Sequence, residues 1–188
     1  MPSLIVIGGP NGSGKTTLTS YLVQKGRIRT EVINPDSIAI NELGSYSFQI
    51  QAARIALNRR KESIVNHLDL AFETTFSGKS EINEVLAAKK AGYKTVLYYV
   101  ALQSILDNII RVEERQSNLG HNVDREDVTR RHKKSLNNLL EYIVFFDQAY
   151  LFDNSGAKRS RVAIFNNGEL IWLNPKHANH PFFQPLFQ

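Results

Sequence analysis

The stretch that decides the fold reads Gly9-Pro10-Asn11-Gly12-Ser13-Gly14-Lys15-Thr16 and lies near the start of the chain. It follows the apolar residues 4–7 and precedes residues 17–22, which have the composition of a helix. A strand, a glycine-rich turn and a helix, with the pattern G-x-x-x-x-G-K-[ST], predict a phosphate-binding loop. Glycines let consecutive backbone N–H groups turn inward around an anion, and the helix N-terminus points at the same anion.

The polar residues of this loop have distinct expected roles. Lys15 should contact the β- and γ-phosphates as a point charge, and the Thr16 hydroxyl should hold Mg²⁺. The expected cofactors are therefore ATP and Mg²⁺. The residues expected to bind the nucleotide are Gly9, Pro10, Asn11, Gly12, Ser13, Gly14, Lys15, Thr16, Thr17, Arg111 and Asn154.

Length and composition indicate one soluble domain over residues 1–188, with 42% hydrophobic and 22% charged residues. The chain has no cysteine, which excludes disulfides and thiol chemistry and permits a reducing compartment. No apolar run approaches the ~20 residues that span a bilayer, and the first run lacks the basic lead of a signal peptide. We therefore expect a cytoplasmic protein that does not bind membranes.

The net charge of +5 suits binding of a polyanion, including a nucleotide. The basic residues occur in short groups separated by acids and do not form one continuous stripe. This distribution disfavours nucleic acid as the partner. It favours a small-molecule acceptor.

Apolar, β-branched segments alternate with helical segments along the chain. Strands are predicted at 3–8, 31–34, 68–75, 95–101 and 149–152, and helices up to 24, at 48–66, 80–91 and 104–117, and from 124. This alternation predicts an α/β fold of the P-loop kinase type, a doubly wound parallel sheet of about five strands with helices on both faces. An Asn-Gly pair between 161–165 and 169–173 predicts a β-hairpin beyond the parallel core, and the hairpin and tail occupy residues 161–188.

Residues 111–134 are predicted to form an arginine-bearing helical lid over the nucleotide. Arg111 and Arg115 lie four apart on one helix face, and the next helix carries Arg131 after a glycine break. The alternative for these arginines is a solvated surface with salt bridges. His121, in the break, is interpreted as a loop residue because no second histidine lies at metal-ligand spacing.

Two carboxylates follow predicted strands. Asp36 comes after the second strand and should share a rim with the phosphate loop, because ligands bind at the carboxyl ends of parallel strands. Its alternative role is a cap of the next helical turn. Glu73 interrupts an apolar run, where a carboxylate is costly unless it is paired or binds a ligand. A site role and a structural ion pair both remain open for Glu73.

Phosphoryl transfer needs charge neutralisation at the γ-phosphate and a carboxylate that deprotonates the acceptor hydroxyl. We assign the neutralisation to Lys15, Mg²⁺ and a clamp of Arg115 and Arg131. Asp36 is the predicted base.

In the order of its motifs the chain resembles the zeta-toxin-like P-loop kinases, including small zeta-like ATPases. The resemblance spans residues 3–156 and rests on Gly8 to Thr17, Asn34-Pro35-Asp36, Phe72 to Gly78, Gly92 to Thr95, Arg111 to Leu136 and Asp153-Asn154-Ser155. It implies a kinase acting on a sugar hydroxyl of a UDP-N-acetylglucosamine-like nucleotide sugar, restrained by a protein antitoxin. It also implies that Asp36 is the catalytic base, and that Glu73 and Thr75 contact the acceptor together with Asp36.

The chain departs from that family pattern at three places, one of which is Lys134 where an arginine is expected. Phe76-Ser77 stands where a basic residue is expected, and one glycine precedes His121 where two are expected. Two other functions stay open from the residues: a kinase for a nucleic-acid end, and a nucleotide-dependent regulatory ATPase or switch. A transporter ATPase of the ABC type is disfavoured because the chain has no L-S-G-G-Q signature.

Overall fold

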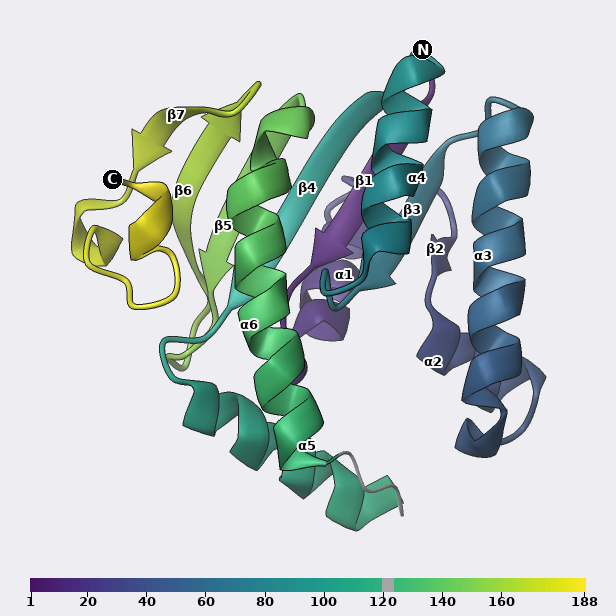
Figure 1. The fold of residues 1–188 in the computed structure, drawn as a ribbon, viewed down its shortest axis with the longest axis horizontal. Coiled ribbons are helices and arrows are strands. Elements are labelled where there is room, and N and C mark those ends of the chain that lie inside the picture. Colours follow the sequence, from purple (N-terminus) through teal and green to yellow (C-terminus); the bar gives the residue numbers. More distant parts are fainter. Residues whose placement is uncertain (120–123) are drawn as a thin grey trace.

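The computed structural model contains one seven-stranded sheet with helices on both faces (Figure 1). It describes residues 1–119 and 124–188, and of residues 115–119 only the backbone. The strand order is β2-β3-β1-β4-β5-β6-β7; the five strands β1 to β5 run parallel, and β6 and β7 are antiparallel to their neighbours. The strands are β1 (Ser3–Gly8), β2 (Val32–Ile33), β3 (Leu70–Thr74), β4 (Lys94–Ala101), β5 (Gln148–Asp153), β6 (Ser160–Asn166) and β7 (Glu169–Leu173).

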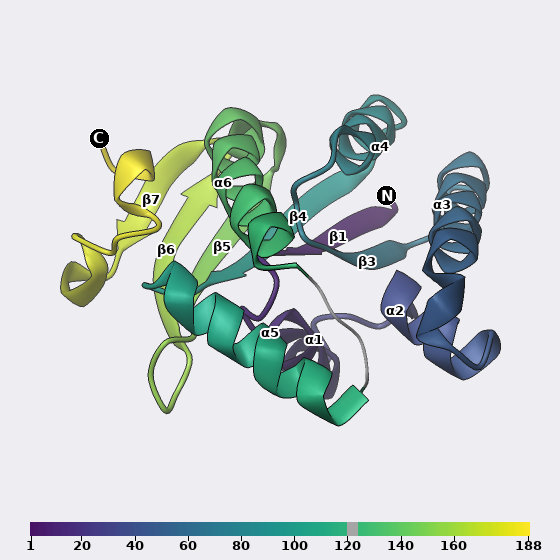
Figure 2. The ribbon, with the colours of Figure 1, turned by 60° about the horizontal axis from the view of Figure 1, so that its bottom comes forward.

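The helices form two layers, α1 and α5 on one face and α3, α4 and α6 on the other (Figure 2). They are α1 (Lys15–Gln24), α2 (Pro35–Ser37), α3 (Gln49–Val65), α4 (Lys79–Lys90), α5 (Ile105–Leu119) and α6 (Arg125–Tyr142). Strand β1 feeds both layers, because successive side chains point to opposite faces. Leu4 and Val6 pack in the larger apolar cluster, whereas Ile5 and Ile7 pack in the cluster that contains α1. The doubly wound prediction is confirmed.

The C-terminal hairpin differs from the prediction in one respect. β6 and β7 form around Asn167 and Gly168 as expected, but β6 pairs with β5 and so extends the same sheet. The tail after β7 returns to the larger apolar cluster, where Phe182 and Phe183 are buried. Their aromatic rings supply the area that holds this segment on the domain.

A buried ion pair joins α3 to α4. The Arg60 Nε atom lies 2.7 Å from Glu84 Oε2, and both side chains are more than nine-tenths buried. The guanidinium also lies 4.8 Å from the centre of the Phe72 ring. Burial raises the pKa of Glu84, and the charge of Arg60 offsets only part of this rise. At neutral pH the buried carboxylate is therefore a cost that its partner only partly offsets.

We expect Glu84→Leu to lower the free energy of unfolding by about 3–5 kcal/mol, because the Arg60 guanidinium then stays buried without its partner. The double replacement Arg60→Met with Glu84→Leu should recover most of this loss, since both charges leave the interior. Urea denaturation at pH 7 measures all three proteins. A double variant as unstable as Glu84→Leu would contradict the expectation.

Candidate active site

The glycine-rich loop turns between β1 and α1 at positions where only glycine fits. Gly12 and Gly14 have φ of 74° and 94°, a region that L side chains rarely adopt. A Cβ on Gly12 would lie 2.6 Å from the Asn108 carbonyl oxygen, and one on Gly14 would lie 2.3 Å from Asn154 Nδ2. Because these two glycines have no Cβ, α5 and the segment after β5 can lie directly against the loop.

The start of α1 has the features of an anion site. Its N-cap residue Gly14 offers no side-chain cap, and the first turn contains no acidic residue. The N–H groups of this turn are left for a ligand or water, with the positive end of the helix dipole behind them. Within the described part of the chain, the buried Ser13 Oγ has no hydrogen-bond partner, and this hydroxyl can donate to a phosphate oxygen. These features fit a bound phosphate.

Lys15 folds back onto the loop. Its Nζ donates hydrogen bonds to the Gly9 oxygen at 2.9 Å and the Pro10 oxygen at 3.0 Å. The ammonium is thereby held at the start of the loop, and its contact with the β- and γ-phosphates stays a prediction.

Glu73 lies at the centre of a polar cluster beside the loop. Its Oε2 accepts from Thr16 Oγ1 at 3.2 Å and from Asn34 Nδ2 at 3.0 Å, and its Oε1 accepts from Thr19 Oγ1 at 2.6 Å. Glu73 is buried, and among the described residues no lysine or arginine forms an ion pair with it. Within the described residues, the contacts of Glu73 are therefore hydrogen bonds from hydroxyl and amide groups, which favour a site role. A hydroxyl and a carboxylate in contact form the hard-oxygen pair that Mg²⁺ prefers.

Asp36 lies in the first turn of α2 and is exposed. The helix cap is Asn34 and not Asp36, because the Asn34 side chain accepts from the Asp36 N–H at 2.9 Å. The capping alternative for Asp36 is therefore wrong. The Asn34 side chain also donates to Glu73, so it connects the turn that carries Asp36 to Glu73. Glu73 in turn contacts Thr16.

A second set of polar side chains lies near the loop, on α5 and just after β5. They are Asn108, Arg111 and Asn154. Asn154 Nδ2 donates to the Ser13 oxygen at 3.0 Å, and the Asn154 oxygen accepts from Arg111 Nη2 at 3.0 Å. The fully buried Asn108 donates from Nδ2 to the Asn11 oxygen at 2.6 Å. The structure thus brings Asn154 and Arg111 to the phosphate loop. Asn108 was not predicted, although its position at the start of a helix that follows a strand end was a usable signal.

The segment that carries Thr75 is held by α6. Ser135 Oγ donates to the Thr75 oxygen at 2.6 Å and accepts from the fully buried Tyr99 hydroxyl at 2.6 Å. Asn138 Nδ2 donates to the Phe76 oxygen at 3.0 Å. Sequence reasoning missed Ser135 and Asn138, because a serine and an asparagine inside a polar helix carry no signal of a distant backbone partner.

The arginines of the predicted lid divide into two groups. Arg125 pairs with Glu113, and Arg130 with Asp127, so the surface salt-bridge alternative is confirmed for these two. Arg131 is half-buried, and its Nη2 lies 4.0 Å from Asp127 Oδ2, the outer limit of an ion pair. The Arg115 side chain and the glycine break with His121 lie outside the described residues. α5 ends at Leu119 and α6 begins at Arg125, and a lid over the nucleotide stays a prediction.

The sequence model of the Zeta toxin family matches residues 1–172, which include every element of this site. The chain belongs to the Zeta toxin family. An uncharacterized protein of Haemophilus influenzae is 32% identical over 126 residues, 66% of this chain and 88% of that protein.

Two solved structures place this Zeta toxin family chain among P-loop kinase-like folds. The complex of AvrRxo1-ORF1 and -ORF2 with ATP gives a TM-score of 0.71 at 17% identity, covering 100% of this chain and 64% of that one. The PezAT toxin–antitoxin system of Streptococcus pneumoniae gives 0.62 at 20% identity, covering 87% and 72%. The chain thus spans less than two thirds of the AvrRxo1 chain. Within the described residues, no helix is both long and apolar enough to cross a bilayer.

We expect Asn154→Ala in this Zeta toxin family chain to weaken nucleotide binding about tenfold, because the Ser13 carbonyl loses its hydrogen bond from the Asn154 side chain. Isothermal titration with ATP and Mg²⁺ measures the change. Asn58→Ala, on the exposed face of α3, is the matched control and should bind as the wild type does. Equal affinities for Asn154→Ala and the wild type would contradict the role of Asn154.

Proposed function

We propose that the protein is an ATP-dependent kinase that transfers the γ-phosphate to a hydroxyl group of a small acceptor. The observation that carries the proposal is the contact between the Thr16 hydroxyl and the Glu73 carboxylate next to the loop that holds Lys15. The oxygens of Thr16 and Glu73 suit Mg²⁺, and the positive charge of Lys15 beside them suits a triphosphate. Family membership and the likeness to AvrRxo1-ORF1 in its complex with ATP support the same nucleotide.

The residues of the loop bind and orient the triphosphate in this proposal. Backbone N–H groups and Lys15 hold the β- and γ-phosphates, and Thr16 and Glu73 hold Mg²⁺. Bound Mg²⁺ would neutralise charge on the phosphate oxygens. Arg115 and Arg131 are proposed to clamp the γ-phosphate, and Arg111 is proposed to bind the nucleotide.

Asp36 is the proposed base. It takes the proton of the acceptor hydroxyl, the acceptor oxygen forms a bond to the γ-phosphorus, and the bond to the β–γ bridging oxygen breaks, which releases ADP. Thr75 is proposed to contact the acceptor. The contacts of Glu73 favour its role toward Mg²⁺, whereas an acceptor contact of Glu73 rests on the family resemblance.

The acceptor that we propose is a nucleotide sugar like UDP-N-acetylglucosamine, because the resemblance implies it. A protein antitoxin is proposed as partner, since PezAT is a toxin–antitoxin system and AvrRxo1-ORF1 is found in complex with AvrRxo1-ORF2.

The test is transfer from γ-labelled ATP to a panel of nucleotide sugars, nucleosides and oligonucleotides. We expect label on a nucleotide sugar and on no oligonucleotide. Label on oligonucleotide ends would assign the protein to nucleic-acid kinases. Slow hydrolysis without transfer to any acceptor would favour the nucleotide switch.

A further inference from the structure

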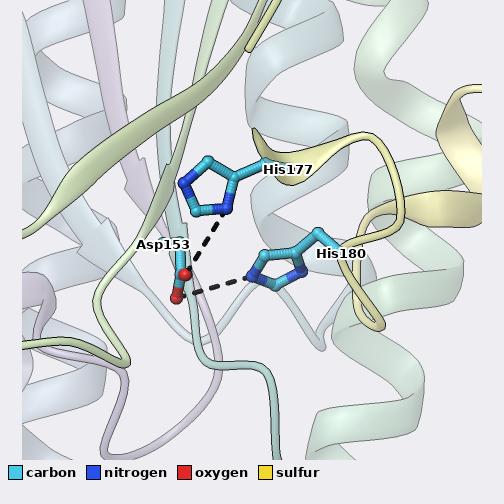
Figure 3. A group of neighbouring side chains, drawn as sticks. All are labelled: Asp153, His177 and His180. Carbon is cyan, nitrogen blue, oxygen red and sulfur yellow. Dashed lines mark ion pairs between the residues drawn. The ribbon is translucent and has the colours of Figure 1, made fainter. Parts of the chain in front are cut away.

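Three ionisable side chains join the end of β5 to the C-terminal segment (Figure 3). Asp153 is the last residue of β5, and His177 and His180 lie in or just after the helical turn Pro175–His177. His177 Nδ1 lies 3.6 Å from Asp153 Oδ2, and His180 Nε2 lies 3.5 Å from Asp153 Oδ1. Both distances are longer than a normal N–H···O hydrogen bond. They are close to the ~3.3 Å that separates two ligands at about 2.0–2.1 Å from one tetrahedral ion.

His180 Nε2 is the observation that points to a ligand. The His180 side chain is fully buried, its Nε2 is directed at Asp153, and among the described residues this atom has no hydrogen-bond partner. A buried polar atom without a partner is costly unless something else satisfies it.

Neighbouring polar side chains hold His177 and Asp153 in place by hydrogen bonds. His177 Nε2 lies 2.7 Å from Ser160 Oγ, which leaves Nδ1 directed at Asp153. Gln103 Nε2 donates to Asp153 Oδ2 at 2.9 Å. Hydrogen bonds of this kind orient metal-binding imidazoles and carboxylates.

We propose that Asp153, His177 and His180 bind one divalent transition-metal ion, with Zn²⁺ the ion best suited to two imidazoles and a carboxylate. The ligand atoms all lie within 4.8 Å of one another, so small side-chain movements bring them onto one ion. Three protein ligands leave a fourth position for water. The site is separate from the oxygen pair of Thr16 and Glu73, which suits Mg²⁺.

Binding of the ion has a proton consequence. His180 Nδ1 accepts from the Phe182 N–H at 3.2 Å, which places the proton of the neutral ring on Nε2. Coordination at Nε2 displaces this proton to Nδ1, so the Phe182 hydrogen bond is exchanged for a metal–nitrogen bond. The Phe182 amide is therefore a local reporter of the ion.

The ion would fasten a segment that the family match does not reach. The match ends at residue 172, so His177 and His180 lie beyond it, whereas Asp153 lies within it. The residue after Asp153 is Asn154, which holds the Ser13 carbonyl of the phosphate loop. The site thus ties the C-terminal segment to the strand end that supports this loop.

The test uses the full chain without a histidine tag, freed of metal by a chelator and titrated with ZnCl₂ in excess MgCl₂. We expect one Zn²⁺ per chain, a Tm that rises with Zn²⁺ concentration, and a shift of the Phe182 amide resonance. Co²⁺ should give the intense visible absorption of a four-coordinate ion. His177→Gln and His180→Gln should each weaken Zn²⁺ binding by more than the about 10–100-fold that loss of an outer contact costs.

His132→Gln is the matched control. His132 is partly buried, its Nε2 has no hydrogen-bond partner in the described chain, and its ring centre lies 5.1 Å from that of Phe182, but it lies outside the cluster. It should bind Zn²⁺ as the wild type does. His177→Gln, the less buried change, keeps the test valid if His180→Gln does not fold. Absence of one-to-one binding to the wild type, or wild-type affinity in both cluster variants, would overturn the proposal. A Tm that responds to pH but not to Zn²⁺ would also overturn it, because the cluster would then bind only a proton.

Discussion

Lys15→Ala is expected to lower kcat/KM for phosphoryl transfer by at least about 10³-fold. It should also weaken ATP binding by about 10–100-fold, the range for loss of one charge-assisted hydrogen bond. The physical reason is that the loop supplies backbone dipoles, while Lys15 supplies its full positive charge. Transfer should suffer more than binding, because negative charge on the γ-phosphate oxygens must be stabilised most strongly as the bond breaks.

The measurement is ATP titration calorimetry together with label transfer to the acceptor found in the screen. Lys25→Ala is the matched control, since Lys25 lies just after the other end of the same helix. Lys15→Ala also loses the two hydrogen bonds that Lys15 donates to the loop. Comparing the Tm of this variant with that of the wild type shows how much stability they contribute. If Lys15→Ala bound ATP and transferred phosphate as Lys25→Ala does, the loop would not be the nucleotide site.

Asp36→Asn should separate binding from chemistry. We expect ATP affinity within about twofold of the wild type and a kcat lower by about 10²–10⁴-fold, the range for loss of a general base. The amide keeps the size of the side chain and removes its ability to take a proton. Because Asp36 is exposed in a short helix, the change should leave the free energy of unfolding within about 0.5 kcal/mol.

Glu31→Gln is the control for Asp36→Asn. It also removes one exposed negative charge, and Glu31 lies just before β2, whereas Asp36 lies just after it. Single-turnover transfer separates the chemical step from product release. Wild-type transfer by Asp36→Asn would disprove the assignment of the base without affecting the nucleotide site. Loss of ATP binding in Asp36→Asn would instead assign Asp36 to the nucleotide.

The metal proposed at Asp153 can fail independently of the kinase proposal. Its readouts are Zn²⁺ stoichiometry, Tm and the Phe182 amide, and none of them depends on transfer. Loss of Zn²⁺ binding in His177→Gln with unchanged ATP affinity would show that the two sites are energetically separate.

Local sequence was sufficient for most of the fold. Each parallel strand is an apolar run between turn signals, and the Asn-Gly pair at residues 167–168 marks the hairpin. The pairing of β6 with β5 was not predicted, because the choice of a neighbouring strand depends on contacts far apart in the chain.

The candidate site was predictable only in part. Glu73 is an example of a residue whose importance, but not whose partners, could be predicted. Its presence in an apolar strand indicated that the carboxylate needs partners. Which partners it has depended on the parallel pairing of β3 with both β1 and β2, which brings α1 and the segment after β2 to one rim. Asn108 and Ser135 show the same limit, because their partners lie 97 and 60 residues away in sequence.

The sequence by itself determined the glycine-rich loop between β1 and α1, because that loop depends on residue types at fixed spacing: glycines for close backbone approach, a lysine, and a helix that begins there. Only the tertiary structure decided which side chains surround it. It brought Glu73 to Thr16 and Asn154 to Ser13, and it enclosed Asp153 with two histidines from beyond the hairpin. Hydrogen bonds and ligand sets of this kind form between atoms that folding brings within about 3 Å, and no local pattern records which distant segments will meet.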